Sequence, residues 1–317
     1  MDTDSRPDAG GGVVAAVDIG GTKIAAALVD EAGTLFARTQ RPTPATAGGE
    51  TVLRTVLDLL DELAASPRWP GVRAVGVGSA GPVDTARGTV SPVNIPGWRD
   101  FPLVERISAH LAPARGRVVL AGDGIAIAAA EHRFGAARPY DNALCMVVST
   151  GVGGGLILGG ALHTGRTGNA GHIGHITVDL DGEPCPCGSR GCLEQLASGT
   201  AIARHALRSG WQPSSQDASA VAVAASARAG DPIALAAYDR AGRALAAGIA
   251  ATATLVELDA VVIGGGVAQV GELLLGPLRR HLTTYAALPF AADLKIHRAH
   301  LGTDAGLVGA AAVAALT

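Results

Sequence analysis

The chain has 317 residues, a length that suits two domains better than one. Hydrophobic residues make up 48% and charged residues 17%, which supports a large core and argues against a disordered chain. The net charge is −3 without a basic stripe, so we expect no nucleic-acid partner. Residues 1–12 form a glycine-rich leader that lacks the apolar stretch of a signal peptide, and no segment indicates a membrane span. We therefore expect a cytoplasmic protein.

Apolar periodicity and turn residues predict the elements of the first part of the chain. Two strands flank a glycine turn, and a second turn follows the returning strand. The expected elements are strands at 13–18 and 24–29, a turn near 30–33, a helix at 51–65, a strand at 72–77, a mostly irregular segment at 78–98, a helix at 103–111 and a buried strand at 118–121.

A similar pattern then restarts, which indicates a duplicated α/β architecture. The expected elements are a helix at 123–134, strands at 143–149 and 156–158, helices at 199–208, 218–228 and 232–257, a strand at 260–263, a helix from 267 and a last helix at 304–316. We place one domain at 13–121, completed by the last helix at 303–317, and a larger α/β domain at 122–302.

Three glycine segments each follow an apolar strand, and turns of this kind suit phosphate groups. A glycine lacks the Cβ that would block an oxyanion from the backbone N–H groups. We predict an ATP site there, although any single segment could be a tight turn without a ligand. The predicted residues are Gly20, Gly21, Thr22, Lys23, Thr150, Gly151, Gly153, Gly154, Gly264, Gly265 and Gly266. We expect Asp18 to hold Mg²⁺ through water, since Mg²⁺ keeps several waters beside few carboxylates.

One histidine and three cysteines have a spacing that suits a metal. His175, Cys185, Cys187 and Cys192 form the pattern H-x9-C-x-C-x4-C. This donor set matches a closed, tetrahedral structural Zn²⁺ site, and such clustering in an intracellular chain favours metal over disulfide. The alternative is three buried thiols beside an ordinary histidine. The predicted zinc knuckle spans residues 175–192 and leaves no position open for catalysis.

Asp123 follows a short apolar strand and opens a helix, which allows two interpretations. A carboxylate there could simply cap the helix and interact with its positive end. It could instead accept the proton of an attacking hydroxyl in phosphoryl transfer, a reaction that otherwise needs mainly positioning and charge neutralisation. Glu131, two turns further along the same helix, is expected on a solvated face.

Together these residues resemble the ROK family of bacterial sugar kinases and repressors, which have an actin-like, ribonuclease H-like duplicated fold of two α/β domains. The resemblance covers nearly the whole chain and is most specific in residues 18–23, 149–155 and 171–194. It implies an ATP- and Mg²⁺-dependent kinase that phosphorylates a sugar hydroxyl, with the 6-hydroxyl as the expected acceptor. It also implies a homodimer, and Asp123 as the general base.

The resemblance and the loop positions also predict the sugar-binding residues. They are Gly81, Asn94, Gly122, His172, His175 and Glu194. His175 would give one ring nitrogen to zinc and the other to the sugar. The loops that carry Gly81 and Asn94 would close over the sugar and exclude water.

Two departures from the family pattern bear on the substrate. Most members carry Asn where this chain has Gly122, and many glucose-specific members carry Glu in place of His172. The run from Ala170 to His175 is similar to that of bacterial N-acetylmannosamine kinases, so N-acetylmannosamine is the first expectation. Kanosamine (3-amino-3-deoxyglucose), N-acetylglucosamine and glucose remain alternatives. A sugar-sensing regulatory protein without turnover is the alternative of another class.

Overall fold

The computed structural model of the protein describes residues 12–111 and 116–316. The chain forms two compact units, one of Met1–Ala126 with Asp304–Thr317 and the other of Ile127–Thr303. The chain passes between the units within α3 (Asp123–Phe134) and again at the end of the short 3₁₀ helix η4 (Gly302–Asp304). The first passage lies a few residues beyond the boundary expected near 121–123.

The first unit contains seven strands within the described residues. They are β1 (Val13–Ile19), β2 (Lys23–Val29), β3 (Leu35–Pro42), β4 (Val72–Ser79), β5 (Val83–Asp84), β6 (Thr89–Val90) and β7 (Arg117–Gly122). Besides the start of α3, its helices are α1 (Gly49–Ala64), the 3₁₀ helix η1 (Trp69–Gly71), α2 (Leu103–His110) and α10 (Ala305–Leu316). The main sheet has the order β3-β2-β1-β4-β7, in which β1, β2 and β3 are antiparallel neighbours and β4 and β7 run parallel to β1.

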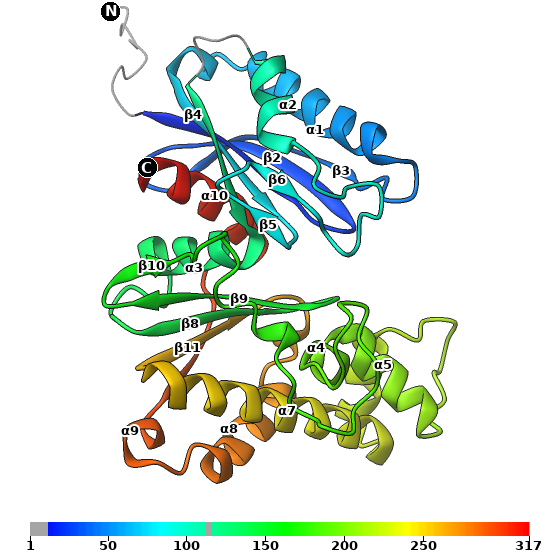
Figure 1. The fold of residues 1–317 in the computed structure, drawn as a ribbon. Helices are drawn as coiled ribbons and strands as arrows, with labels where there is room; N and C mark the ends of the chain where they lie inside the picture. The colour runs from blue at the N-terminus through cyan, green and yellow to red at the C-terminus, as the bar shows by residue number, and fades with distance from the viewer. Residues whose placement is uncertain (1–11, 112–115, 317) are drawn as a thin grey trace, which may run out of the picture. The chain divides into compact units, whose positions relative to one another are not determined.

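Successive residues of β1 point to opposite faces of this sheet, and the two faces differ in the size of their side chains. Large aliphatic residues, such as Ile19, pack with α1 and α2 on one face. Alanines, such as Ala16, face α10 on the other (Figure 1). The helix lies so close that a Cβ on Gly76 would fall 2.1 Å from the carbonyl oxygen of Ala310. Small residues on this face therefore set the distance between sheet and helix.

The second unit repeats the strand arrangement. Its strands are β8 (Ala143–Val148), β9 (Val152–Leu158), β10 (Ala161–His163), β11 (Ala260–Gly264) and β12 (Lys295–Arg298). They form a sheet of order β10-β9-β8-β11-β12, with β8, β9 and β10 antiparallel and β11 and β12 parallel to β8. Each sheet therefore combines an antiparallel meander with two parallel strands in the same positions, which confirms the predicted duplication.

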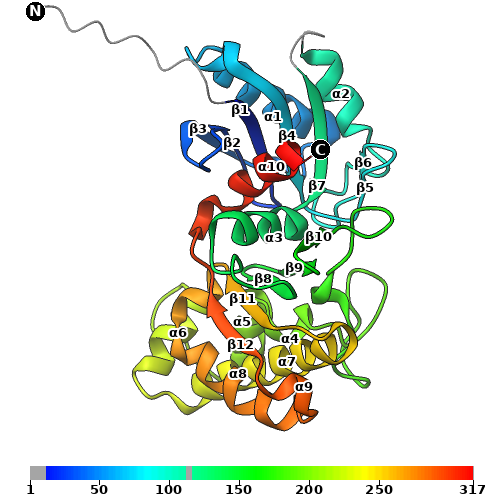
Figure 2. The same cartoon turned by 90° about the vertical axis from the view of Figure 1, so that its left-hand side faces the viewer.

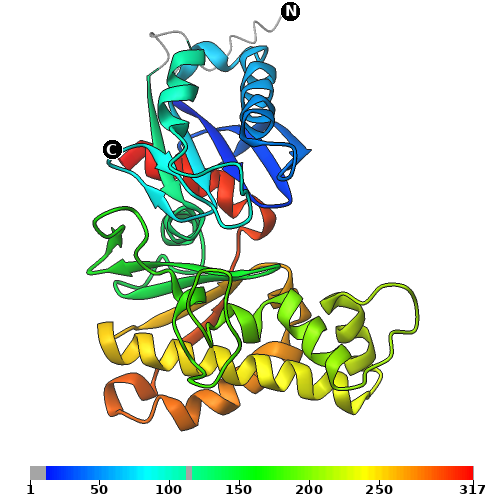
Figure 3. The ribbon, with the colours of Figure 1, turned by 45° about the vertical axis from the view of Figure 1, so that its right-hand side comes forward.

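Helices cover both faces of the second sheet. The helical elements are η2 (Ile173–His175), α4 (Glu194–Ala197), α5 (Gly199–Arg208), α6 (Ala220–Arg228), α7 (Pro232–Val256), η3 (Val267–Val270), α8 (Glu272–Tyr285) and α9 (Pro289–Ala292). The long α7 packs beside α8 below the sheet in Figure 3, and Figure 2 shows α8, α9 and β12 together. Met146 of β8 points to this helical layer, whereas Cys145 points to the opposite face and packs near Ala128 of α3.

Several elements differ from the sequence expectation. The segment 78–98 contains the hairpin of β5 and β6, and the helix expected from 267 is the short η3 followed by α8. The expected leader lies outside the described residues except for Gly12, whose N–H donates to Glu31 Oε1 at 3.1 Å. Among the described residues no single helix is long and apolar enough to cross a membrane; α6 and α7 reach that length and composition only as a pair bent by 117°.

Candidate active site and metal centre

In the first unit, two aspartates lie at the same end of the sheet. Ile19 of β1 is paired with Ser79 of β4, and Ser79 is paired with Gly122 of β7. Asp18 directly precedes this row of paired residues and Asp123 directly follows it. The parallel strands β1, β4 and β7 thus bring both carboxylates to their common carboxyl end, where ligands bind in open α/β sheets.

The carboxylate of Asp18 lies in a crowded and charged environment. A Cβ built on Gly306, in the first turn of α10, would fall 2.5 Å from Asp18 Oδ2. Burial raises the pKa of Asp18 to about 6, the negative charge of Asp123 adds to the rise, and Lys23 opposes it. Asp123 opens α3, and its Oδ1 accepts a hydrogen bond from the N–H of Gly124 at 2.7 Å.

The first glycine turn, residues 20–22, joins β1 to β2. The N–H of Gly20 donates to the carbonyl of Lys23 at 3.0 Å and closes the turn. Thr43 supports it from β3's end, since its Oγ1 donates to the carbonyl of Gly20 at 2.7 Å and its N–H to that of Thr22 at 3.0 Å. Asn94 contacts Gly21 so closely that a Cβ there would fall 2.3 Å from Asn94 Nδ2.

The other predicted sugar-binding residues of the first unit are Gly81, which lies in a loop before β5, and Gly122, which lies at the end of β7. The carbonyl of Gly81 accepts a hydrogen bond from the N–H of Val93 at 3.4 Å, which links the loop of Gly81 to the loop of Asn94. Gly122 is the last residue of β7 and is buried. All predicted residues of this unit therefore belong to β1, β7, the first glycine turn, the first residue of β2 or of α3, or the loops around the β5–β6 hairpin.

The second glycine turn, residues 149–151, joins β8 to β9 in the second unit. The N–H of Ser149 donates to the carbonyl of Gly151 at 2.8 Å. Thr150 is in this turn, whereas Gly153 and Gly154 belong to β9. A Cβ on Gly153 would meet no atom within 4 Å, so the backbone is open to a ligand at this position.

The third glycine segment meets the second turn. Gly265 has a φ of 94°, in the left-handed region that favours glycine, and a Cβ there would fall 2.4 Å from the carbonyl oxygen of Val148. The second turn is also fixed to the start of α5, because the N–H of Gly199 donates to the carbonyl of Ser149 at 2.7 Å. Gly264, Gly265 and Gly266 therefore lie beside the second turn, although more than a hundred residues separate them in the sequence.

The four predicted metal ligands converge. One ligand atom from each of His175, Cys185, Cys187 and Cys192 lies within 4.8 Å of the others. His175 Nδ1 is 3.7 Å from Cys185 Sγ, and the Sγ atoms of Cys187 and Cys192 are 3.7 Å apart. Ligand atoms bound about 2.0–2.3 Å from one tetrahedral Zn²⁺ have separations of this size. The residues present thus fit the group that the sequence predicts.

The metal-ligand cluster is continuous with a group of polar side chains. The ring of His172 stacks on that of His175 at a centroid distance of 5.2 Å. Burial lowers the pKa of His172, His175 adds to the lowering, and the charge of Glu194 opposes it. Glu194 Oε2 also accepts a hydrogen bond from the N–H of Val152 at 2.9 Å, directly beside the second glycine turn. His172, His175 and Glu194 are therefore neighbours, as predicted from their sequence positions.

Glu131 departs from the expectation of a solvated face, and that prediction is wrong. The residue is fully buried, and its carboxylate accepts hydrogen bonds from the N–H groups of Ala136 at 2.9 Å, His300 at 3.0 Å and Leu301 at 3.0 Å. The helix α3 is rich in alanine around its whole circumference, and such helices are buried. That signal places Glu131 inside. Its carboxylate connects the end of α3 to the segment that leads into η4.

Comparisons with known proteins agree with this geometry. The profile of the ROK family matches residues 14–316, so the chain belongs to the ROK family. A glucokinase from Thermotoga maritima is 36% identical over 310 residues, which cover 94% of this chain and 95% of the relative. An N-acetylmannosamine kinase from Yersinia pseudotuberculosis is 40% identical over 298 residues, 93% of this chain and 96% of the relative.

A solved structure of a family member is also similar to this chain over nearly its full length. The crystal structure of a ROK family glucokinase from Streptomyces griseus, in complex with glucose and AMPPNP, matches with a TM-score of 0.84 at 36% identity. The match covers 96% of this chain and 100% of that chain. The actin-like fold of duplicated α/β units is thereby confirmed.

Proposed function

We propose that this protein is an ATP-dependent sugar kinase in which Asp123 removes the proton from the hydroxyl that is phosphorylated. The kinase class rests on similarity over nearly the full length to curated sugar kinases of two specificities. The roles of individual residues rest on the geometry described above, and each is open to test.

The observation that carries the assignment is the pairing of Ile19, Ser79 and Gly122 in one row. It brings Asp18 and Asp123 together beside the first glycine turn. A carboxylate next to a second carboxylate and an anionic ligand holds a proton more readily than one in water. A base in this position can take up the hydroxyl proton as the oxygen attacks the terminal phosphorus and ADP leaves.

The phosphate groups are proposed to lie against the glycine turns. In the first unit, Gly20, Gly21, Thr22 and Lys23 would supply N–H, hydroxyl and ammonium donors. Mg²⁺, when bound with ATP, neutralises phosphate charge, and Asp18 would hold it through water. In the second unit, Thr150, Gly151, Gly153 and Gly154 would bind phosphate oxygens, and Gly264, Gly265 and Gly266 would line the adenosine site. The open backbone at Gly153 supports this proposal.

The sugar is proposed to contact His172, His175 and Glu194 in the second unit and Gly81, Asn94 and Gly122 in the first. His175 directs Nδ1 to Cys185, which leaves Nε2 for a sugar hydroxyl. We further propose Zn²⁺ for the His175, Cys185, Cys187 and Cys192 cluster. With all four positions taken by protein, the metal would fix the loop that carries Glu194 and would take no part in the chemistry.

The sugar itself is proposed to be N-acetylmannosamine, phosphorylated on the 6-hydroxyl. The His172 form of the histidine motif and the absence of Asn at Gly122 support an amino sugar over glucose. Kanosamine, N-acetylglucosamine and glucose are the rivals. A homodimer, implied by the family resemblance, is also a proposal, and light scattering of the purified protein checks it.

The test is ADP release with ATP and a panel of N-acetylmannosamine, N-acetylglucosamine, glucose, mannose and 3-amino-3-deoxyglucose. We expect turnover on one amino sugar, and a loss of about 10³-fold or more in kcat for Asp123→Asn. Zinc content and a cooperative unfolding transition of the variant serve as controls, because the substitution should leave the protein folded with its metal bound. Near-normal activity of Asp123→Asn would disprove the assignment of the base. Binding of a sugar without any turnover would favour the sensor.

A further inference from the structure

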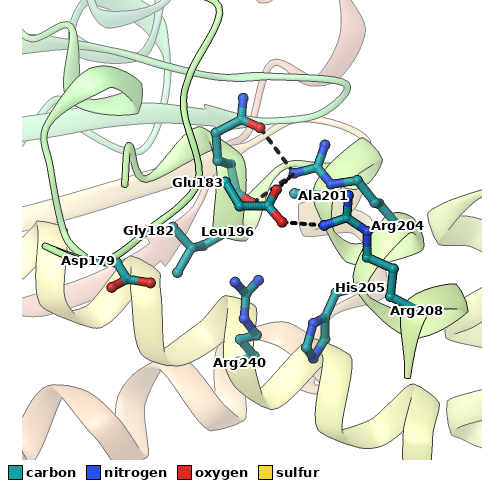
Figure 4. Close-up of a pocket in the computed structure, with 10 residues that line it drawn as sticks. Asp179, Gly182, Glu183, Leu196, Ala201, Arg204, His205, Arg208 and Arg240 are labelled. Carbon is teal, nitrogen blue, oxygen red and sulfur yellow. Dashed lines mark hydrogen bonds and ion pairs between the residues drawn. The ribbon is translucent and has the colours of Figure 1, made fainter. Parts of the chain in front are cut away.

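A small pocket in the second unit takes no part in the proposed reaction. It lies between the loop that joins His175 to Cys185, the short helix α4, and the helices α5 and α7 (Figure 4). Its volume is about 50 Å³. By the same measure a single water needs about 10–15 Å³, and pockets for drug-sized ligands reach about 300 Å³ or more. The pocket therefore has room for one small group and is too small to enclose a whole nucleotide.

Arg240 of α7 points into this pocket. Figure 4 shows its guanidinium directed inward between Asp179 and His205, without a dashed line to any residue drawn. Over residues 12–111 and 116–316, no hydrogen bond reaches this guanidinium. Burial lowers the pKa of Arg240, and the charges of Asp179 and Glu183 oppose this effect only in part. A half-buried cation with unused donors favours a ligand that brings negative charge and acceptor oxygens.

Two further arginines line the pocket from α5. Arg208 forms an ion pair with Glu183, and Arg204 Nη2 lies 3.8 Å from the same carboxylate. Arg204 also donates to the backbone carbonyl and side-chain Oε1 of Gln195, at 3.2 and 3.0 Å. The three lining arginines carry three positive charges against the two negative charges of Asp179 and Glu183, so the ionised lining has a net charge of +1.

His205 is the remaining titratable residue of the lining, and its side chain can take part in binding an anion. Burial lowers the pKa of His205, and the positive charge of Arg240 adds to the lowering. The neutral ring can donate one hydrogen bond. An anion placed between His205 and Arg240 could accept a hydrogen bond from the neutral ring and pair with the charged guanidinium.

We propose that this pocket binds a single tetrahedral oxyanion of the phosphate class. The planar guanidinium fork of Arg240 suits two oxygens of such an ion, and Arg204 and Arg208 add positive charge from the facing helix. The same chemistry is offered by free inorganic phosphate and by the phosphate group of a phosphorylated metabolite. The site is separate from the glycine segments at which ATP is proposed to bind.

The experiment is calorimetric titration of inorganic phosphate into the zinc-loaded protein, with chloride at equal ionic strength as the reference. Arg240→Gln is the test variant. Arg243→Gln is the matched control, because Arg243 lies one turn along the same helix and is exposed, outside the pocket lining. We expect the Kd for phosphate to rise about tenfold or more in Arg240→Gln, as expected when a charge-assisted hydrogen bond is lost. Arg243→Gln should stay within about twofold of the parent.

Two further measurements keep the test decisive. Arg240→Lys retains the charge without the fork, so it serves if Arg240→Gln fails to fold, and it should bind phosphate with intermediate affinity. The proton NMR signal of His205 should move on addition of phosphate in the parent and in Arg243→Gln. Hexose 6-phosphate in place of phosphate separates the two sources, provided that only the part of its binding lost in Arg240→Gln is counted, because such a compound is also the product class of the proposed reaction. Tighter binding in that part identifies a phosphorylated metabolite, and equal binding identifies free phosphate. The proposal would be overturned if titration of phosphate released the same heat as titration of chloride. It would also be overturned if Arg240→Gln bound phosphate with the same Kd as the parent.

Discussion

The glycine turn at residues 20–22 follows β1, and the turn at residues 149–151 follows β8, the strand at the centre of the second sheet. The first carries its acidic group on the strand itself, because Asp18 lies two residues before Gly20. The second receives Glu194 from outside the sheet, on the helix that follows the long loop 164–193. The two turns share a scaffold position and differ in how their chemical groups arrive. The duplicated sheet therefore supplies a glycine turn in both units. In the second unit, a long segment outside the sheet supplies the acidic side chain, Glu194.

Loss of the metal should have the largest effect on the second turn. The proposed metal fixes the loop that brings Glu194 to this turn. We expect Cys192→Ser to lose the metal and to lower the free energy of unfolding by about 3 kcal/mol or more. Metal analysis and urea unfolding measure both effects. Hydrogen exchange should locate the loss of protection in the second unit.

The matched control is Cys145→Ala, since Cys145 is fully buried in β8 and outside the metal-ligand cluster. Burial also raises the pKa of its thiol, which disfavours the metal-binding thiolate. This variant should keep the metal. A full complement of metal in Cys192→Ser would argue against the proposed ligand set.

The open backbone at Gly153, in β9 just after the second turn, should respond differently from the crowded backbone of the first turn. We expect Gly153→Ala to change the free energy of unfolding by at most about 0.5 kcal/mol, because the added methyl group meets no protein atom. The same methyl group would occupy the proposed place of a phosphate oxygen, so the KM for ATP should rise roughly tenfold, a loss of about 1.4 kcal/mol.

Gly21→Ala is the companion variant in the first turn. Its methyl group would displace the side chain of Asn94, so both stability and activity should fall. Steady-state kinetics and urea unfolding of the two variants test the pair. An unchanged KM for ATP in Gly153→Ala would remove Gly153 from the proposed phosphate site.

A further expected effect appears only when the pH changes, and it concerns the pH dependence of stability through Asp18, the acidic residue beside the first turn. The pKa of Asp18 is raised from 3.8 to about 6 in the folded protein, so the folded state binds this proton more tightly than the unfolded state. Its contribution therefore favours folding below pH 4 and is lost as the pH rises to about 6. A shift of this size corresponds to at most about 3 kcal/mol.

Asp18→Asn removes this titration and isolates it from the other carboxylates. The stability of the variant minus that of the parent should increase between pH 4 and pH 7. Urea unfolding of both proteins without nucleotide, at several pH values, measures the difference. In Asp123→Asn the rise in the pKa of Asp18 should be smaller, since one of its causes is gone. A difference that stays constant with pH would contradict the assignment.

Elements with strong periodicity are predictable from the sequence. The helix at 51–65 has aliphatic residues on one face, and those residues are the ones that α1 buries. The strands β1 and β8 are predictable as apolar runs that end in glycine turns. The metal cluster and the group of His172, His175 and Glu194 are predictable because their residues lie close together in the sequence, so one loop can bring them into contact.

Elements whose position depends on distant contacts are not predictable in this way. The strand β3 is mostly exposed and its sequence, LFARTQRP, lacks a buried face, so its pairing with β2 is the main sign of a strand. The partners of Glu131 come from residues 300–301, far along the chain. Likewise, the pocket of Arg240 is built from three helices and a loop, and only their packing brings the three arginines together.

The position of α10 bears on how the protein is made. This helix covers the alanine face of the first sheet, where Leu307, Ala310 and Ala311 pack against Ala16 and Ala27. During synthesis, residues 127–303 must leave the ribosome before this helix does. At about 5–20 residues per second, the interval is roughly 9–35 s. Over that interval the second unit can fold completely while one face of the first sheet stays uncovered. The unit whose synthesis begins first is thus the one whose folding is completed last.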